Sequence, residues 1–260
     1  MGGVPRSGTT LLRVVLDTHP RIFCGTELRA VHAVTNLFAA AQVHSGDLLR
    51  TSYGLSEQAL ADIFSELILS FFQPAWPASG KPRVAEKTPS NVLAFPQLRA
   101  LFPESPLIHV IRDVRDVVAS RLERDRASGG AALDTVTTAR ARAREWVDTM
   151  EVARWMQADP TRARAYFEVR YEALVQTPEQ VLVPLFEFIG ERFDPVVLQF
   201  HRVSRNVSGT EEWSADAVRR EIFTSSIGRW RHTLSPAEVQ AVVSEASQTM
   251  TELGYDISEQ

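Results

Sequence analysis

A glycine-framed loop at the start of the chain most constrains the fold. Gly3 and Gly8 stand five residues apart, Thr10 follows, and the apolar residues 11–16 continue at once as the start of a helix. This frame is typical of loops whose backbone N–H groups hold phosphate at a helix N-terminus, where the helix dipole favours negative charge. Such a loop normally follows a buried strand, so the frame predicts an anion site in an α/β protein.

The loop lacks a lysine that nucleotide triphosphatases need. Thr9 occupies the position before Thr10 where those enzymes have lysine, and Arg6 is the only cation inside the loop. The loop is therefore suited to holding an anion but not to γ-phosphate chemistry. We expect Arg6, Ser7, Gly8, Thr9 and Thr10 to bind the anion through backbone amides, hydroxyl groups and one guanidinium. An ordinary glycine-containing turn is the alternative.

A second anion site is predicted after a short apolar strand at residues 107–111. A Walker-type enzyme would end that strand in an acid that holds Mg²⁺, whereas here Arg112 follows it. Ser120, eight residues later on the next helix, can face the same sheet edge and complete a guanidinium–hydroxyl clamp. Arg124 extends this clamp or lies on a solvated helix face. His109, inside the strand, is expected to be a hydrogen-bonded core residue rather than a base. Two anion sites without a metal ligand favour a nucleotide with phosphates at both ends.

Together these segments resemble the sulfotransferase family. Residues 3–10 are similar to the family's loop for the 5′-phosphosulfate of 3′-phosphoadenosine 5′-phosphosulfate (PAPS), and Arg112 with Ser120 is similar to its 3′-phosphate clamp. The tyrosylprotein sulfotransferase branch is the most similar, over residues 2–256. Its matching segments are residues 16–20, 24–29, 86–89, 169–175 and 253–256. The resemblance implies one α/β sulfotransferase domain over residues 1–260, with a P-loop-like parallel sheet flanked by helices.

The resemblance also implies a reaction: in-line transfer of a sulfuryl group from PAPS to a tyrosine hydroxyl, without a metal. A phenol, with a pKa near 10, must lose its proton during that transfer. Glu27 matches the family's catalytic acid, although Thr26 stands where the branch has another acid. Lys87 matches the lysine that offsets charge on the leaving oxygen. Pro89 stands where small-molecule sulfotransferases have a histidine base, which favours Glu27 as the base.

Further residues follow from the resemblance. Ser214 aligns with a functional serine of the family's nucleotide-covering loop, and Ser214 and Arg6 complete the predicted catalytic set. Arg220 and Arg229 are expected to bind the phosphates, and Tyr171 to contact the adenine side. A plain loop serine and a core tyrosine are the alternatives for Ser214 and Tyr171.

The predicted acceptor is a tyrosine in acidic surroundings, which is the branch's usual target. Arg29, close behind Glu27, is expected to pair with an acidic side chain of such a peptide. Sulfation of a carbohydrate or small-molecule hydroxyl stays open as an alternative. A nucleotide kinase or a P-loop binding module is disfavoured, because both the loop lysine and the Mg²⁺-binding acid are missing.

The composition is ordinary for a globular protein. Of the 260 residues, 44% are hydrophobic and 23% are charged, and the net charge is −4. We expect one domain, or a core with an inserted cap, and no nucleic acid as a partner. Cys24 is the only cysteine, so no internal disulfide forms, and it is expected in the core. The sequence has no 18-residue apolar stretch and no signal peptide, which predicts a cytoplasmic bacterial enzyme without a membrane partner. A trimmed lumenal fragment and a homodimer stay open.

Helical segments alternate with short apolar strands, which favours a parallel sheet. Only two residues precede Gly3, so either the protein starts further upstream or the strand before the loop is a stub. We expect a loop over the nucleotide at residues 203–224. The expected strands are 21–24, 83–85, 107–111 and 165–169, and the expected helices are 9–18, 28–44, 56–73, 90–101, 113–126, 134–157, 178–189 and 236–253.

Overall fold

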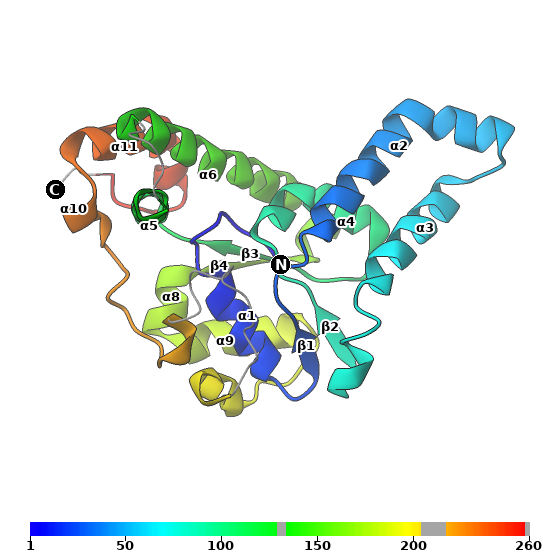
Figure 1. Ribbon diagram of the computed structural model, residues 1–260, viewed down its shortest axis with the longest axis horizontal. Coiled ribbons are helices and arrows are strands. Elements are labelled where there is room, and N and C mark those ends of the chain that lie inside the picture. Colours follow the sequence, from blue (N-terminus) through cyan, green and yellow to red (C-terminus); the bar gives the residue numbers. More distant parts are fainter. Residues whose placement is uncertain (129–133, 204–216, 258–260) are drawn as a thin grey trace.

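The computed structural model describes residues 1–128, 134–203 and 217–257 and has short central strands surrounded by helices (Figure 1). The strands of this part are β1 (Ile22–Cys24), β2 (Arg83–Ala85), β3 (Leu107–Ile111) and β4 (Tyr166–Arg170). Its α-helices are α1 (Thr9–Thr18), α2 (Ala30–Ser52), α3 (Glu57–Ser70), α4 (Phe95–Leu101), α5 (Val114–Ala127), α6 (Thr135–Gln157), α7 (Pro160–Ala163), α8 (Tyr171–Gln176), α9 (Pro178–Phe188), α10 (Trp230–Thr233) and α11 (Pro236–Glu252). Its 3₁₀ helices are η1 (Pro77–Ser79), η2 (Pro89–Ala94), η3 (Pro195–Arg202) and η4 (Ala217–Arg219).

The strands form two parallel ladders, β1 with β2 and β3 with β4, and the backbone at Gly2 lies between them. The Gly2 N–H donates to the Ile108 carbonyl, and the Gly2 carbonyl accepts from the Val110 N–H, both at 2.9 Å. On the other side, the Gly3 N–H donates to the carbonyl of Pro89, just beyond β2, also at 2.9 Å. The residue before the anion loop (residues 3–10), Gly2, pairs with His109 of β3 as an isolated parallel bridge. The expected parallel sheet flanked by helices is confirmed.

The parallel direction of the strands positions the site. Because parallel strands end at the same edge of a sheet, the segments that follow them meet there. Glu27 lies in the segment after β1, and Lys87 lies just beyond β2. Arg112 directly follows β3, and Tyr171 directly follows β4. The anion loop follows Gly2, which lies between the two ladders. The predicted residues named above therefore lie at this edge of the sheet.

Side chains of β3 alternate between two cores. Ile108 and Val110 pack in the core that contains α1, whereas Ile111 packs with residues of α5, α6 and α11. Trp146 of α6 is 1% exposed, and its indole N–H donates to the carbonyl of Arg112 at 3.0 Å. This hydrogen bond fixes the backbone where β3 ends and the predicted clamp begins.

His109 is a buried core residue, as expected, with a hydrogen bond at Nδ1 but no partner for Nε2 among the described residues. Its Nδ1 lies 2.8 Å from the hydroxyl of Tyr166, which in turn donates to the carboxylate of Glu168 at 3.0 Å. The Tyr166 hydroxyl has one proton and gives it to Glu168, so Nδ1–H of His109 is the donor in the first bond. Burial, with a smaller contribution from Arg170, lowers the pKa of His109 to about 3, so the ring is neutral at pH 7. Cys24 is also buried, as expected, and burial raises the pKa of its thiol to about 12.

Helices α2 and α3 form a hairpin that extends from the rest of the molecule (Figure 1). Phe38 packs on Phe64 with ring centroids 5.4 Å apart, and the Ser56 hydroxyl caps α3 by accepting from the Ala59 N–H at 3.1 Å. Helix α2 runs further than the expected end at residue 44, although the interior Gly46 costs helix stability. Packing within the hairpin core, which reaches beyond that glycine, accounts for the longer helix.

Two other expectations need comment. The short helix α8 between β4 and α9 was not predicted, because Pro178 marks only the start of the second helix. Most of the loop expected at residues 203–224 lies outside the described residues, and its end contains η4. Across residues 1–128, 134–203 and 217–257, no helix has both the length and the apolar character needed to cross a membrane.

Candidate active site

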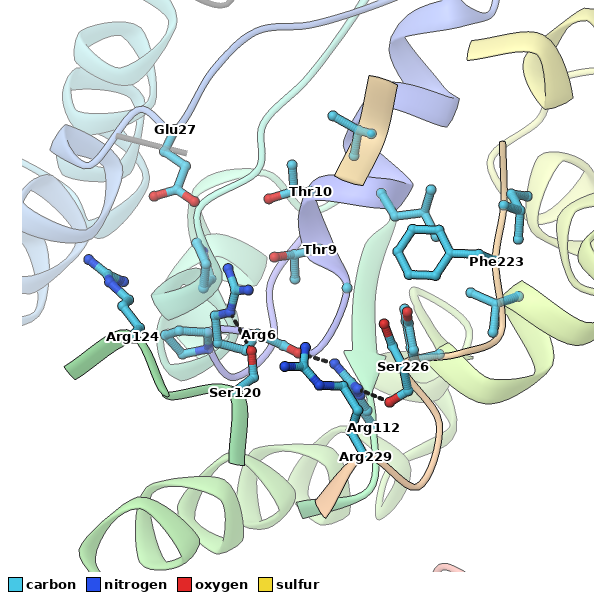
Figure 2. Close-up of a pocket in the computed structure, with 18 of the residues that line it drawn as sticks. Arg6, Thr9, Thr10, Glu27, Arg112, Ser120, Arg124, Phe223, Ser226 and Arg229 are labelled. Carbon is cyan, nitrogen blue, oxygen red and sulfur yellow. Dashed lines mark hydrogen bonds between the residues drawn. The ribbon is translucent and has the colours of Figure 1, made fainter. Parts of the chain in front are cut away.

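A cavity of about 640 Å³ opens at the carboxyl edge of the sheet (Figure 2). The predicted site residues that line it are Arg6, Gly8, Thr9, Thr10, Glu27, Arg29, Arg112, Ser120, Arg124, Tyr171 and Arg229. Ser7 and Lys87 are buried and do not belong to this lining. Arg220 is exposed and lies outside the lining, and Ser214 lies outside the described residues. One cavity therefore brings together most residues of both predicted anion sites.

The anion loop is fixed to α5 through Arg6. Its Nε–H donates to the hydroxyl of Ser120 at 2.9 Å (Figure 2), although the two residues are 114 positions apart. Arg6 has a φ of 79°, in the left-handed region that residues other than glycine rarely adopt. Arg112 donates to the Arg6 carbonyl at 3.1 Å, which helps to hold this conformation. The loop and the clamp are thus one connected unit.

Gly8 starts α1 against the ring of Tyr171. Gly8 has a φ of 101°, and a Cβ atom there would lie 2.4 Å from Tyr171 Cδ2. As the N-cap residue, Gly8 offers no side-chain acceptor to the first N–H groups of α1, and the first turn contains no acidic residue. The buried hydroxyl of Ser7 has no hydrogen-bond partner among the residues that the structure describes. Donors at this helix start are therefore available to an anion.

Four arginines, Arg6, Arg112, Arg124 and Arg229, converge on the cavity (Figure 2). Burial lowers the pKa of Arg6, and the charges of Arg112, Arg124 and Arg229 lower it further. Arg229 pairs with Glu123 at 2.5 Å. The mutual repulsion of these guanidinium groups favours an anion among them, and their planar N–H groups suit phosphate or sulfate oxygens.

Asp116 anchors the segment that contains Ser226 and Arg229, which forms the C-terminal wall of the cavity. The sequence analysis missed this residue. It is 1% exposed and accepts hydrogen bonds from the backbone N–H groups of Gly228 at 2.8 Å and Trp230 at 3.0 Å. Arg112 donates to the carbonyl of Ser226 at 2.5 Å and lies 3.7 Å from Asp116. The sequence signal that could have identified Asp116 is its position on α5 four residues after Arg112, a spacing at which opposite charges can pair. Burial raises the pKa of Asp116, while Arg112 and the two N–H groups oppose that shift.

Glu27 and Lys87 meet at the cavity edge. Lys87 Nζ lies 2.6 Å from Glu27 Oε1 and 3.4 Å from the Thr10 hydroxyl. The Lys87 side chain is fully buried, whereas that of Glu27 is 24% exposed. Arg29 Nε lies 4.0 Å from the other Glu27 oxygen. A carboxylate that faces the cavity is thus joined to a buried ammonium beside the anion loop.

The part of the cavity beyond Tyr171 is apolar. Its wall contains Val175 of α8, Phe200 of η3, Val218 of η4 and the following Ile222 and Phe223. These side chains can cover a flat heterocycle, next to the arginines that can hold its phosphates. The sequence analysis expected residues 203–224 over the nucleotide, and Val218, Ile222 and Phe223 fall in that range. It missed Val175 and Phe200, because they come from separate short segments without a periodic pattern.

A metal centre is not formed by the residues that the structure describes. Within these ranges, no group of three or more His, Cys, Asp or Glu side chains is arranged to hold an ion. The donors that converge on the cavity are instead guanidinium, hydroxyl and backbone N–H groups.

Comparisons with known proteins agree with this geometry. Residues 1–195 match the sulfotransferase family. The chain is 28% identical over 263 residues to protein-tyrosine sulfotransferase 2 of Gallus gallus, covering 98% of this chain and 68% of that protein. It is 27% identical over 260 residues to protein-tyrosine sulfotransferase A of Caenorhabditis elegans, covering 98% of this chain and 66% of that protein.

A solved structure shows the same fold. The sulfotransferase domain of the olefin synthase from Synechococcus PCC 7002 superposes with a TM-score of 0.66 at 20% identity, covering 98% of this chain and 93% of that domain. The family match spans 195 of the 260 residues, and it includes the anion loop, Glu27, Lys87 and the Arg112–Ser120 clamp. The chain therefore belongs to the sulfotransferase family and is a sulfotransferase enzyme.

Proposed function

We propose that this enzyme transfers the sulfuryl group of PAPS to the hydroxyl of a tyrosine in a peptide or protein. The observation that carries the proposal is the Glu27–Lys87 pair at the edge of a cavity with two arrays of anion-binding donors. The named relatives are protein-tyrosine sulfotransferases, which supports tyrosine as the acceptor.

The cavity residues suit a nucleotide with phosphate groups at both ends. The partnerless Ser7 hydroxyl and the start of α1 would hold the 5′-phosphosulfate together with Arg6. Arg112, Ser120 and Arg124 would hold the 3′-phosphate, and the apolar wall would cover the adenine. When bound, PAPS supplies a sulfuryl group: the bond from sulfur to the acceptor oxygen forms, the bond from sulfur to the 5′-phosphate oxygen breaks, and adenosine 3′,5′-bisphosphate is left.

Glu27 is the proposed base. Its carboxylate, which lines the cavity, would accept the proton of the tyrosine hydroxyl, because a neutral phenol is a poor nucleophile. Lys87, paired with Glu27 and close to Thr10, would place its positive charge where negative charge develops on the leaving oxygen. Arg6 would act on the same charge from within the loop, and Ser214 remains a further catalytic candidate.

Arg29 is the proposed contact for the acceptor peptide. Its side chain is 67% exposed and lies beside Glu27 at the cavity wall. An acidic residue near the target tyrosine would pair there with the guanidinium. Such a contact would put the peptide backbone across the cavity mouth, with the tyrosine directed toward Glu27.

The test is transfer of label from ³⁵S-PAPS to a panel of acceptors. The panel contains an acidic tyrosine peptide, the same peptide with phenylalanine at that position, a simple phenol and an oligosaccharide. We expect label only on the tyrosine peptide, with the sulfate located on the tyrosine by mass spectrometry. Label on the oligosaccharide or phenol in preference to the peptide would reject tyrosine as the acceptor and favour the small-molecule alternative.

A binding measurement tests the donor site separately. Adenosine 3′,5′-bisphosphate is expected to raise the melting temperature without added Mg²⁺, since a ligand that binds only the folded state stabilises it. Equal stabilisation by ATP with Mg²⁺ would contradict the proposed donor.

A further inference from the structure

A carboxylate next to Lys87 ties together the segments that carry the catalytic pair. Glu86, directly after β2, accepts hydrogen bonds on Oε1 from the Leu28 backbone N–H at 3.1 Å and from the Thr88 hydroxyl at 2.7 Å. Its Oε2 accepts from the side-chain amide of Asn91 on η2. One side chain thus connects the segment after β1, the end of β2 and η2.

The bond to Leu28 is the important one for the site. Leu28 is the chain neighbour of Glu27, and Glu86 is the chain neighbour of Lys87. The segment between β1 and α2, which carries Glu27, has no regular secondary structure, so its position depends on such contacts. Glu86 therefore fixes the backbone next to Glu27 to the backbone next to Lys87.

Glu86 cannot act on a substrate directly. It is not part of the wall of the active-site cavity, whereas Glu27 and Thr88 are. Along the chain after β2, Lys87 reaches Glu27 and Thr10 while Glu86 reaches Leu28, Thr88 and Asn91. Any effect of Glu86 on the reaction must therefore pass through its neighbours.

We propose that Glu86 is a positioning residue, which fixes the Leu28 backbone and so keeps Glu27 at hydrogen-bond distance from Lys87 and directed at the reacting groups. The proposal rests on the proposed role of Glu27 as the base. Small displacements of a catalytic group are costly, since a shift of about 1 Å can lower a rate by roughly 100-fold. Glu86 prevents such a shift by satisfying an N–H group of the segment that would otherwise be free to move.

Two substitutions separate the effect of the Glu86 hydrogen bonds from the effect of its side-chain volume. Glu86→Met fills a similar volume but offers no strong acceptor to Leu28, Thr88 or Asn91. Glu86→Gln keeps an oxygen for Leu28 and Thr88. Its amide N–H₂ can donate to the Asn91 Oδ1, which has no partner within the described part of the chain, once the Asn91 amide turns over.

We expect Glu86→Met to lower kcat by roughly 10- to 100-fold. KM for PAPS and the affinity for adenosine 3′,5′-bisphosphate should stay within about twofold, because the nucleotide donors are elsewhere. Glu86→Gln should restore most of kcat. The matched control is Glu238→Met. Glu238 is 2% exposed, takes part in the capping box of α11 and is not part of the cavity lining, so this variant should keep kcat.

Amide hydrogen exchange at Leu28 gives a readout that does not depend on activity. Loss of the acceptor in Glu86→Met should speed this exchange by roughly tenfold or more, whereas Glu86→Gln should leave it slow. A folded Glu86→Met variant with unchanged kcat or unchanged exchange overturns the proposal. So does a Glu86→Gln variant as impaired as Glu86→Met, because charge rather than hydrogen bonding would then matter.

A double variant separates this proposal from the proposed function. If Glu86 acts through Glu27, adding Glu86→Met to Glu27→Gln should lower kcat no further. If Glu27→Gln alone retains full turnover, the base assignment fails, while the exchange at Leu28 still reports on the tether. Should Glu86→Met not fold, Asn91→Ala, which removes one donor to Glu86, is expected to give a smaller fall in kcat in the same direction. An unchanged kcat in folded Asn91→Ala would then overturn the proposal.

Discussion

Lys87 Nζ lies 2.6 Å from Glu27 Oε1, although the two residues are 60 positions apart in the chain. The contact arises because β1 and β2 are parallel neighbours whose following segments meet at one edge of the sheet. The ammonium is buried and the carboxylate faces the cavity, so the contact with Lys87 orients the Glu27 carboxylate at the cavity wall. A pre-arranged pair of this kind reduces the reorganisation needed during the reaction.

Glu27→Gln should lower turnover by roughly 10²–10⁴, the usual contribution of a positioned base. Glutamine keeps the shape of the side chain but cannot accept a proton at neutral pH. The affinity for adenosine 3′,5′-bisphosphate should stay near normal, since the arginines and the anion loop are unchanged. Steady-state kinetics with a tyrosine peptide and calorimetry with the bisphosphate check the two parts. Turnover close to that of the unchanged enzyme would mean that another residue is the base.

Arg112→Ala and Arg220→Ala should behave differently, although both arginines were predicted to bind phosphate. Arg112 lines the cavity, so its removal should weaken bisphosphate binding by roughly 10- to 100-fold, the value of a hydrogen bond to a charged group. Arg220 is exposed outside the lining, so its removal should change affinity by less than about threefold. Calorimetry at one salt concentration makes the comparison. Equal losses for both variants would place Arg220 in the site.

Asp116→Asn should weaken both the fold and nucleotide binding. One of the two N–H donors, from Gly228 or Trp230, would face an amide N–H₂, and Arg112 would lose its buried partner. We expect a loss of about 2 kcal/mol or more in the free energy of unfolding, measured in urea. The control is Asp134→Ala, which removes the cap of α6 and should cost about 1 kcal/mol without weakening bisphosphate binding. Unchanged affinity in Asp116→Asn would show that the C-terminal wall does not need this anchor.

Buried His109 should make the fold sensitive to acid. Its pKa is near 6.5 in the unfolded chain and about 3 in the fold, so between these values the unfolded state binds more protons. Above about pH 6.5, His109 therefore does not reduce the free energy of unfolding. As the pH drops from there toward 3, this free energy falls by up to about 1.4 kcal/mol per pH unit. Three ionisable groups surround the ring. Tyr166 is hydrogen-bonded to it, Glu168 accepts from the Tyr166 hydroxyl, and the charge of Arg170 lowers the pKa of His109.

His109→Gln removes the titrating ring while keeping a hydrogen-bonding amide. In urea unfolding between pH 7 and pH 4.5, this variant should lose less stability on acidification than the unchanged protein does. Parallel stability curves for the two proteins would show that His109 is not the group responsible.

The charged and hydroxyl-bearing residues of this site could be predicted from sequence, but the side chains of its apolar wall could not. The anion loop, Arg112 and Ser120 have fixed spacings, and Glu27 and Lys87 follow predictable strands, so their placement at one edge follows from parallel topology. Phe200 and the residues after η4 line the cavity through the packing of short segments. Their positions depend on contacts between distant parts of the chain, which leave no local pattern.

The same distinction applies to buried acids. Asp116 and Glu86 hold backbone N–H groups from distant segments, and nothing in a short stretch of sequence reveals which N–H groups those are. The end of α2 was missed for a related reason, since contacts inside the hairpin outweigh the helix-weakening Gly46.

The contact between Gly8 and the ring of Tyr171 has an evolutionary consequence. A methyl group at position 8 would enter the ring at 2.4 Å and would also face an unfavourable φ of 101°. Shrinking residue 171 relieves only the first problem, and it removes the surface on which Arg112 rests with its guanidinium 4.5 Å from the ring centroid. A substitution at position 8 is therefore not rescued by a smaller residue at position 171. Across related sequences we expect glycine at position 8, arginine at position 112 and an aromatic ring at position 171 to be retained together.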